Sequence, residues 1–314
     1  MSPTSRLSLS TLLAPFFRPV RSARADRAVT APVSRDDDAQ GAAPGVRPAS
    51  SAGGSTRVPA PGGAGTSKGG ARADTAAPRA EGLPVTLGGA PARQVDGTTC
   101  GSAALVMLAA TGDPALAGWL LHGSLPDARP PEIPPEIPSD GVGPAGRFAA
   151  AQRHVKARTS RRGLGLLPWP GALGTPPWTA AREARFPGVR YRSLPVDDAS
   201  SRARAVLASV YGATLAGAPV PLYVGDDLRR GPARAVPRHV VLAVPPPADV
   251  PHRGHDESGQ PLLHLYDPSS ARVYPVRVHE LLARQEPHRA LGGWTHVNWV
   301  VLPEPVSGHV SGAG

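Results

Sequence analysis

The only cysteine of the chain, Cys100, is the residue whose type and position point most directly to chemistry. It stands in the segment RQVDGTTCGSAALVML (93–108), where an almost continuous apolar run follows the cysteine and predicts a buried helix. A thiol in the first turn of a helix lies near unpaired backbone N–H groups and the positive end of the helix dipole. Both favour the nucleophilic thiolate. The alternative is that a lone cysteine is a small, unreactive core residue.

A cysteine nucleophile requires an imidazole base and a third group that orients the imidazole. Among ten histidines, His239 is the best placed, because it opens the apolar strand HVVLAV directly after Pro237-Arg238; otherwise it is a polar residue at a strand edge. Asp267 closes the strand PLLHLYDP, which we expect to pair with the His239 strand at a spacing of about 5 Å. The sequence Asp-Pro-Ser-Ser is also favourable in turns, and one aspartate can serve both purposes.

An oxyanion stabiliser would complete this site. Gln94 lies six residues before Cys100, so its side-chain amide and the Cys100 backbone N–H are expected to converge on a developing oxyanion. Gly101 is expected to leave room for a substrate that approaches the sulfur. Three aromatic residues are expected either to shape the cleft or only to pack in the core: Trp178, Tyr223 and Trp294.

The elements that must position these residues follow a simple order, with helices first and strands afterwards. A helix that starts near Cys100 is predicted from the apolar run Gly101 to Ala110, and the turn Gly112-Asp113-Pro114 ends it. Further helices are predicted in the segments 114–121, 144–157, 175–184 (with Thr175 as N-cap) and 197–217. Runs rich in Val, Leu and Tyr predict strands in the segments 219–225, 236–245, 261–268, 271–278 and 295–303. A short helix is predicted in VHELLARQ, between the last two strands. This order predicts an α+β fold with a helical lobe packed on an antiparallel β-sheet lobe.

Composition divides the chain at about residue 83. Residues 1–83 are predicted to be a disordered low-complexity region, because they are dominated by Ala, Gly, Pro, Ser, Thr and charge and bury too little surface to offset chain entropy. Residues 84–303 are predicted to form one domain, and 304–314 a flexible tail. The first 25 residues contain a weak apolar stretch and a cleavage-like Ala-Arg-Ala, but little leading charge. We therefore expect a cytoplasmic protein, with export as the alternative.

The charge pattern argues against several classes of protein. The net charge of +10 comes from arginines that are spread out, without a dense basic block interleaved with aromatics, so no nucleic-acid partner is expected. One cysteine excludes a disulfide framework and a multi-thiolate zinc site. The cluster HRGHDE (His252, His255, Asp256 and Glu257) lies in a loop with no helix to set ligand spacing, so neither a metal nor a cofactor is expected. No apolar run approaches the ~18 residues of a membrane helix.

Gln94, Cys100-Gly101-Ser102, His239 leading a strand and Asp267 closing the next strand resemble the papain-like cysteine peptidase superfamily. The pattern is most similar to the stand-alone relatives of the bacteriocin leader-processing peptidases, which are bacterial, and it covers roughly residues 84–303. The resemblance implies a papain-like fold with a central helix that bears the cysteine. It implies a thiol-dependent hydrolase that cleaves peptide or amide bonds in a peptide or protein substrate, through a Cys-His-Asp triad and a thioester intermediate.

Two features depart from this resemblance. The interval between His239 and Asp267 is longer than such a hairpin needs, and Asn298-Trp299 is similar to the Asn-x-Trp region of papain but one residue shorter. Asn298 is therefore a rival to Asp267 as the orienting residue. Two other functions remain open: transglutaminase-like acyl transfer or deamidation by the same residues, and a catalytically silent papain-like module that only binds a partner.

Overall fold

The computed structural model describes residues 7–8, 82–136, 141–226, 237–247 and 254–305. All of them belong to one unit of the chain, residues 1–19 together with 80–314. Nearly all of the export-like segment and of the region predicted to be disordered, and most of the predicted tail, lie outside the described residues. The ordered elements that concern function begin with a strand at Leu83 and end with a strand at Pro305.

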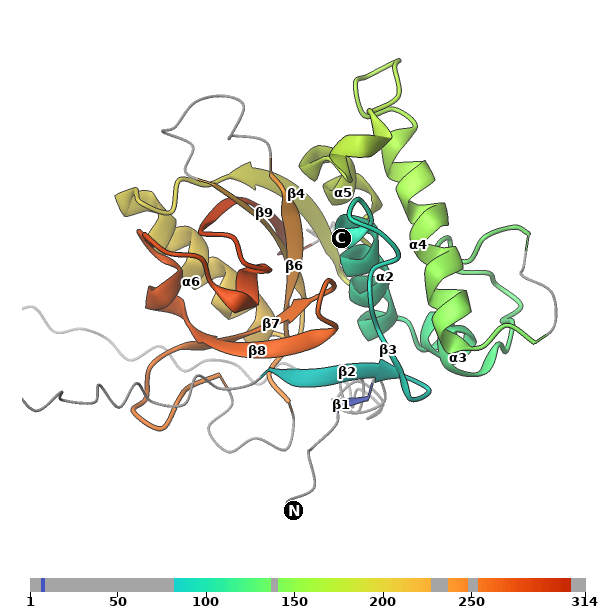
Figure 1. Cartoon of the computed structure of the whole chain (residues 1–314), viewed down its shortest axis with the longest axis horizontal. Helices are drawn as coiled ribbons and strands as arrows, with labels where there is room; N and C mark the ends of the chain where they lie inside the picture. The colour runs from blue at the N-terminus through green and yellow to red at the C-terminus, as the bar shows by residue number, and fades with distance from the viewer. Residues whose placement is uncertain (1–6, 9–81, 137–140, 227–236, 248–253, 306–314) are drawn as a thin grey trace, which may run out of the picture. The chain divides into compact units, whose positions relative to one another are not determined.

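Four helices lie together on one side of the sheet (Figure 1). They are α2 (Cys100–Gly112), α3 (Pro114–His122), α4 (Pro144–Ser160) and α5 (Pro177–Glu183). Helix α2 is buried from Cys100 to Thr111, as its continuous apolar sequence predicts. Asp113 separates α2 from α3 and caps the latter, since its Oδ1 accepts the backbone N–H of Ala115 at 2.9 Å.

Seven strands form an antiparallel sheet in the order β2-β8-β7-β6-β5-β9-β4. Their bounds are β2 (Leu83–Leu87), β4 (Val189–Pro195), β5 (Val220–Gly225), β6 (His239–Val244), β7 (Leu262–Asp267), β8 (Arg272–Arg277) and β9 (His296–Pro305). Two very short strands join at β2: β1 (Leu7–Ser8), which is parallel to it, and β3 (Ala90–Pro91), which is antiparallel. The predicted α+β class is confirmed, and so is the predicted pairing of β6 with β7.

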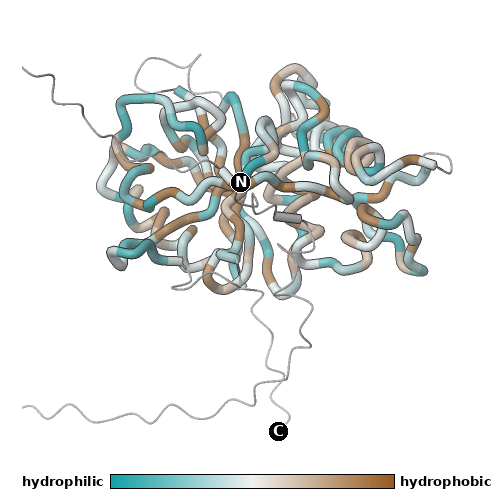
Figure 2. Tube along the Cα trace, turned by 60° about the horizontal axis from the view of Figure 1, so that its bottom comes forward, coloured by the Kyte–Doolittle hydropathy of each residue, from teal (hydrophilic) through white to brown (hydrophobic). Residues whose placement is uncertain are grey.

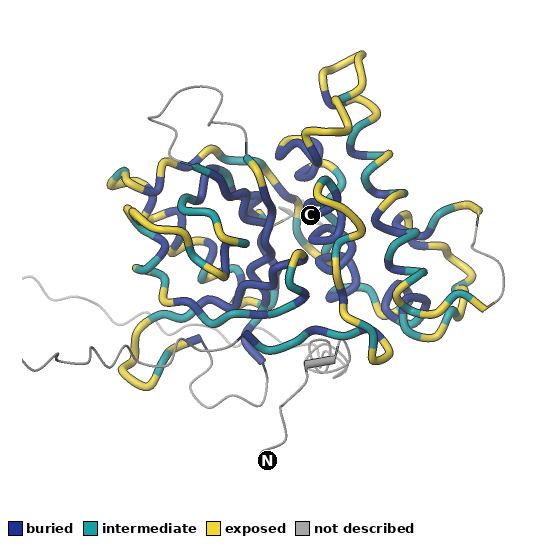
Figure 3. Tube along the Cα trace, viewed as in Figure 1, coloured by how far each residue is buried: buried dark blue, intermediate teal, exposed yellow. Residues whose placement is uncertain are grey.

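The sheet separates two hydrophobic cores, because its central strands are covered on both faces. Alternate residues of β6 face different cores: Val240 and Leu242 join α2, whereas Val241 and Ala243 join the core around α6 (Ser201–Leu215). Every residue of β5 and β6 is therefore buried. Figure 3 shows this buried interior, and Figure 2 shows that hydrophilic residues gather mostly on the outer turns.

Several expectations about the elements are wrong. Strands β2 and β4 were not predicted, and the segment after β8 forms the 3₁₀ turn η5 (Val278–Leu281) instead of a longer helix. Thr175 does not cap α5; Pro176 holds the N-cap position, without a side-chain hydrogen bond. Pro176 and Pro177 fix the backbone angle φ at the N-cap and at the first helical residue. The start of α5 therefore does not require a capping hydroxyl.

No single helix within the described ranges is long and apolar enough to cross a membrane. By length and composition, α2 and α3 pass that test only as a pair, across a bend of 115°.

Candidate active site

Cys100 is the first residue of α2, as the sequence predicts, and it is 5% exposed. The loop before it is fixed by Asp96, whose carboxylate accepts the backbone N–H of Thr98 at 2.7 Å and its hydroxyl at 2.6 Å. Thr99, at the N-cap position, donates its hydroxyl to the Asp96 carbonyl at 3.0 Å. The chain therefore enters α2 on a defined path, with the thiol in the first turn.

His239 and Asp267 meet at one end of two neighbouring strands, because β6 begins where its antiparallel neighbour β7 ends. His239 Nε2 lies 2.7 Å from Asp267 Oδ1, and both residues are almost fully buried. Asp267 also accepts the Ser269 backbone N–H at 2.9 Å, the Ser269 hydroxyl at 2.7 Å and the Ser270 N–H at 3.2 Å. The Asp-Pro-Ser-Ser segment thus both turns the chain and holds the carboxylate against the imidazole.

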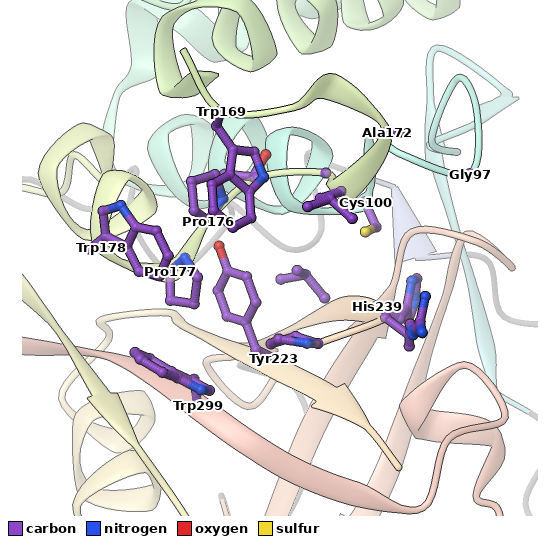
Figure 4. A pocket seen from close by; sticks show the side chains of 16 residues that line it. Gly97, Cys100, Trp169, Ala172, Pro176, Pro177, Trp178, Tyr223, His239 and Trp299 are labelled. Atoms are coloured by element: carbon purple, nitrogen blue, oxygen red, sulfur yellow. The ribbon is translucent and has the colours of Figure 1, made fainter. Parts of the chain in front are cut away.

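The Cys100 sulfur is directed toward the His239 ring (Figure 4), and the thiol is close enough to contribute to the raised pKa of His239. Because Asp267 engages Nε2, Nδ1 is the ring nitrogen left for the thiol. Burial alone would lower the pKa of His239, but the hydrogen bonds and negative charges of Asp267 and Cys100 outweigh it and raise this pKa to about 9. The imidazole therefore holds a proton at neutral pH, as a thiolate–imidazolium pair requires.

The imidazole is also fixed by backbone. Gly292 follows the 3₁₀ turn η6 (Arg289–Leu291) with φ +63°, and a Cβ there would lie 2.5 Å from His239 Cδ2 and 2.8 Å from Nε2. Only a glycine lets the main chain come this close to the ring. The sequence analysis missed this residue, although the Gly-Gly pair before Trp294 was a visible signal of unusual backbone.

Gln94 is near the site, but its amide does not reach the pocket described below. Its backbone N–H donates to the Pro268 carbonyl at 2.9 Å, beside the Asp267 turn. Its Nε2 donates to the Asp96 carbonyl at 2.8 Å, and Gln94 is not among the residues that line the pocket. The backbone N–H of Cys100 is better placed for an oxyanion, since first-turn N–H groups have no acceptor within the helix.

Asn298 does not reach the site. It lies in β9, which β5 separates from β6, and its Nδ2 donates to the Asp226 carbonyl at 3.3 Å. Of the two predicted orienting residues, Asp267 is the one that the structure brings to His239.

A pocket of about 340 Å³ opens beside Cys100 and His239 (Figure 4). The segment before and within α5 forms one wall, with Thr175 and Trp178, and the sheet forms another, with Tyr223 and Trp299. A pocket with a free cysteine thiol at one end is a candidate active site.

The tryptophans of the pocket form a connected group. The rings of Trp169 and Trp178 are 5.3 Å apart and nearly perpendicular, and Trp178 is 6.2 Å from Trp299. Trp178 lines the pocket as expected, but Trp294 packs on the core around α6 instead. Trp169 and Trp299 were missed because they are far apart in sequence and belong to a loop and a strand without a local motif.

The expectation that Gly101 leaves room for a substrate is wrong. A Cβ at Gly101 would lie 2.7 Å from Thr175 Cβ, so Thr175 already fills this space. The glycine instead lets the pocket wall pack directly against the start of α2.

We therefore expect Gly101→Ala to push the 174–177 segment outward and to reduce the reactivity of the site at least tenfold. The matched control is Gly118→Ala in α3, where a Cβ would meet nothing within 4 Å. That substitution should raise stability by about 0.5–1 kcal/mol, because alanine favours helix, without changing reactivity. Thiol alkylation rates and melting temperatures measure both effects, and equal alkylation rates in the two variants would contradict this account of Gly101.

The HRGHDE cluster has other contacts. Asp256 accepts the Arg277 Nε–H at 2.6 Å and the Ser258 hydroxyl at 2.7 Å, and His255 packs against Tyr211. Where the structure describes the chain, no three His, Cys, Asp or Glu side chains are grouped as metal ligands. His252 lies outside that part.

No protein-family model matches the chain, and no curated protein matches it either. The functional conclusion therefore rests on the geometry of this site.

Proposed function

We propose that this protein is a thiol-dependent hydrolase of peptide or amide bonds. Cys100 is the nucleophile, His239 the acid and base, and Asp267 the residue that orients His239. The observation that carries the proposal is the buried chain of contacts from the Cys100 thiol through the imidazole to the Asp267 carboxylate, at one end of a pocket. Such a chain is the arrangement that converts a thiol into a nucleophile at neutral pH.

Each reaction step follows from this geometry. The thiolate attacks the carbonyl carbon, and the Cys100 backbone N–H donates to the developing oxyanion. The tetrahedral intermediate collapses as the imidazolium gives its proton to the leaving nitrogen, which releases an amine and leaves a thioester. Water then attacks the thioester, His239 accepts its proton, and the carboxylic acid product leaves with the thiolate–imidazolium pair restored.

We further propose membership of the papain-like cysteine peptidase superfamily. The support is the arrangement of a buried cysteine-bearing helix against an antiparallel sheet whose neighbouring strands carry the histidine and the aspartate in that order. The position of the Gln94 amide is the feature that fits this resemblance least.

Two other functions compete with hydrolysis. Acyl transfer to an amine, or deamidation of a side-chain amide, passes through the same thioester or its equivalent and differs only in the leaving group and acceptor. A catalytically silent module would not need the thiol at all. The protonated imidazole beside Cys100, held by the Asp267 carboxylate, favours an enzymatic function. A buried ion pair has a desolvation cost, and a module that only binds a partner does not require one.

Iodoacetamide at neutral pH tests the proposal. We expect wild-type Cys100 to be alkylated much faster than free cysteine, and His239→Ala to slow the reaction at least tenfold, because the ion partner of the thiolate is lost. The matched control is His296→Ala, which removes a partly buried histidine that lies 2.9 Å from Asp198 and does not line the pocket. It should leave the rate unchanged. A wild-type rate equal to that of free cysteine would overturn every enzyme reading.

A further inference from the structure

Three hydrogen-bonding groups of the pocket are buried and have no partner within the described part of the chain. They are Trp169 Nε1, Thr175 Oγ1 and Tyr223 Oη. Tyr223 is 2% exposed and Thr175 is 4% exposed, so neither hydroxyl finds water easily. Buried polar groups are normally satisfied, and several unsatisfied groups in one cavity indicate that a ligand supplies the missing partners.

Most of the remaining surface of the pocket is apolar. The rings of Trp178 and Trp299 and the faces of Pro176 and Pro177 line it. In Figure 4 the Tyr223 ring rises from the sheet, and its oxygen is directed toward Pro176 and Trp169, to one side of Cys100. A planar, mostly apolar group with a polar tip would match both the walls and the unpartnered groups.

The charges of the pocket favour a neutral planar ligand over a cationic one. Aromatic walls also suit cations, but no lining residue is acidic, and both Arg238 and the protonated His239 line the pocket. The indole N–H of Trp169 only donates, so its ligand must offer an acceptor. A neutral ring that carries a hydroxyl meets this demand, because the hydroxyl both accepts and donates.

We infer that this pocket selects a tyrosine side chain in the acyl part of the substrate, through Trp169, Thr175 and Tyr223. This inference rests on the proposed thiol hydrolase function and names its substrate class. Phenylalanine would fill the same walls but leave the polar groups unpaired, and leucine would also lose the ring contacts.

N-acetyl amino acid chloromethyl ketones test the selection without turnover. Each reacts with the thiolate to form a thioether and release chloride, so its rate depends on thiol reactivity and on the fit of its side chain. Dividing each rate by the iodoacetamide rate of the same variant corrects for differences in thiol reactivity. We expect the tyrosine compound to react at least tenfold faster than the phenylalanine, leucine, glutamine and lysine compounds.

Variants of the same shape locate the selection. Trp169→Phe and Tyr223→Phe each remove one polar group and keep an aromatic wall, so each should lower the tyrosine-to-phenylalanine ratio at least threefold. The control is Tyr191→Phe, a buried tyrosine outside the pocket whose hydroxyl donates to the Pro219 carbonyl at 3.0 Å; it should keep the wild-type ratio.

The outcomes separate the inference from the function on which it rests. Slow iodoacetamide alkylation in the wild type would overturn the proposed function itself. Fast alkylation with any other compound equal to or faster than the tyrosine compound would overturn only the inferred selectivity. A ratio unchanged in both pocket variants would do the same.

Discussion

Asp267→Asn should reduce the activity of the protein toward its substrates about tenfold or more while leaving Cys100 in place, because an amide can still orient the imidazole but does not stabilise its positive charge. An amide at this position either offers its carbonyl to His239 Nε2 without the negative charge or offers an N–H that demands the wrong tautomer. Single-turnover acylation with an activated ester measures the loss. A variant with more than a tenth of wild-type activity would contradict the assigned role.

The same substitution should change the pH dependence in a defined direction. The Asp267 carboxylate contributes to the raised pKa of His239, about 9, so wild-type kcat/KM should fall as the pH rises through that value and the imidazolium is lost. Without the carboxylate the pKa of His239 falls, so the alkaline limb should move to lower pH. A limb that stays near 9 in Asp267→Asn would show that Asp267 does not hold the proton on the ring.

Asp198→Asn is the matched control for both measurements. Asp198 is also a buried carboxylate that holds a histidine, His296, and it accepts the Val297 N–H at 3.0 Å, but it does not line the pocket. We expect it to cost about 1–3 kcal/mol of stability, as buried hydrogen-bonded groups do, with activity and pH profile unchanged.

Gly292→Ala should reduce activity about a hundredfold or more. Its Cβ would occupy the space of the His239 ring, 2.5 Å from Cδ2, so the imidazole must shift away from Cys100 and Asp267. A displacement of about 1 Å is enough for a loss of this size. Acylation rate and iodoacetamide rate should fall together, because both depend on the same ion pair.

Gly293→Ala controls for backbone strain. Gly293 also has positive φ, +85°, but a Cβ there would meet nothing within 4 Å. Both substitutions should therefore destabilise the protein by about 1–2 kcal/mol, and only the first should affect the site. Equal losses of activity in the two variants would mean that strain, not contact with His239, explains the effect.

Local sequence patterns were sufficient to predict the elements that carry the site. The apolar run after Cys100 predicts α2 because a helix buried on every side has no polar face. The run that begins at His239 predicts β6 for the equivalent reason in a strand. Asp267 could be placed beside His239 because consecutive strands usually pair.

The parts that could not be predicted depend on contacts between distant segments. The edge strand β4 contains alternating arginines and has half-buried positions, so its sequence lacks the apolar run of the central strands. Trp169, Thr175 and Tyr223 come from a loop, the approach to a helix and a strand, and only the packing of helices on the sheet brings them into one pocket. The direction of the Gln94 side chain depends on the local path of the 94–99 loop, which spacing alone does not determine.

The single thiol lies on the boundary between helices and sheet, since Cys100 belongs to α2 and its imidazole partner to β6. The chain has no second cysteine, so a sulfhydryl reagent labels this position alone. The labelling rate of Cys100 therefore reports how closely the helices pack against the sheet. It registers loosening at that junction by temperature, denaturant or mutation before the protein unfolds globally.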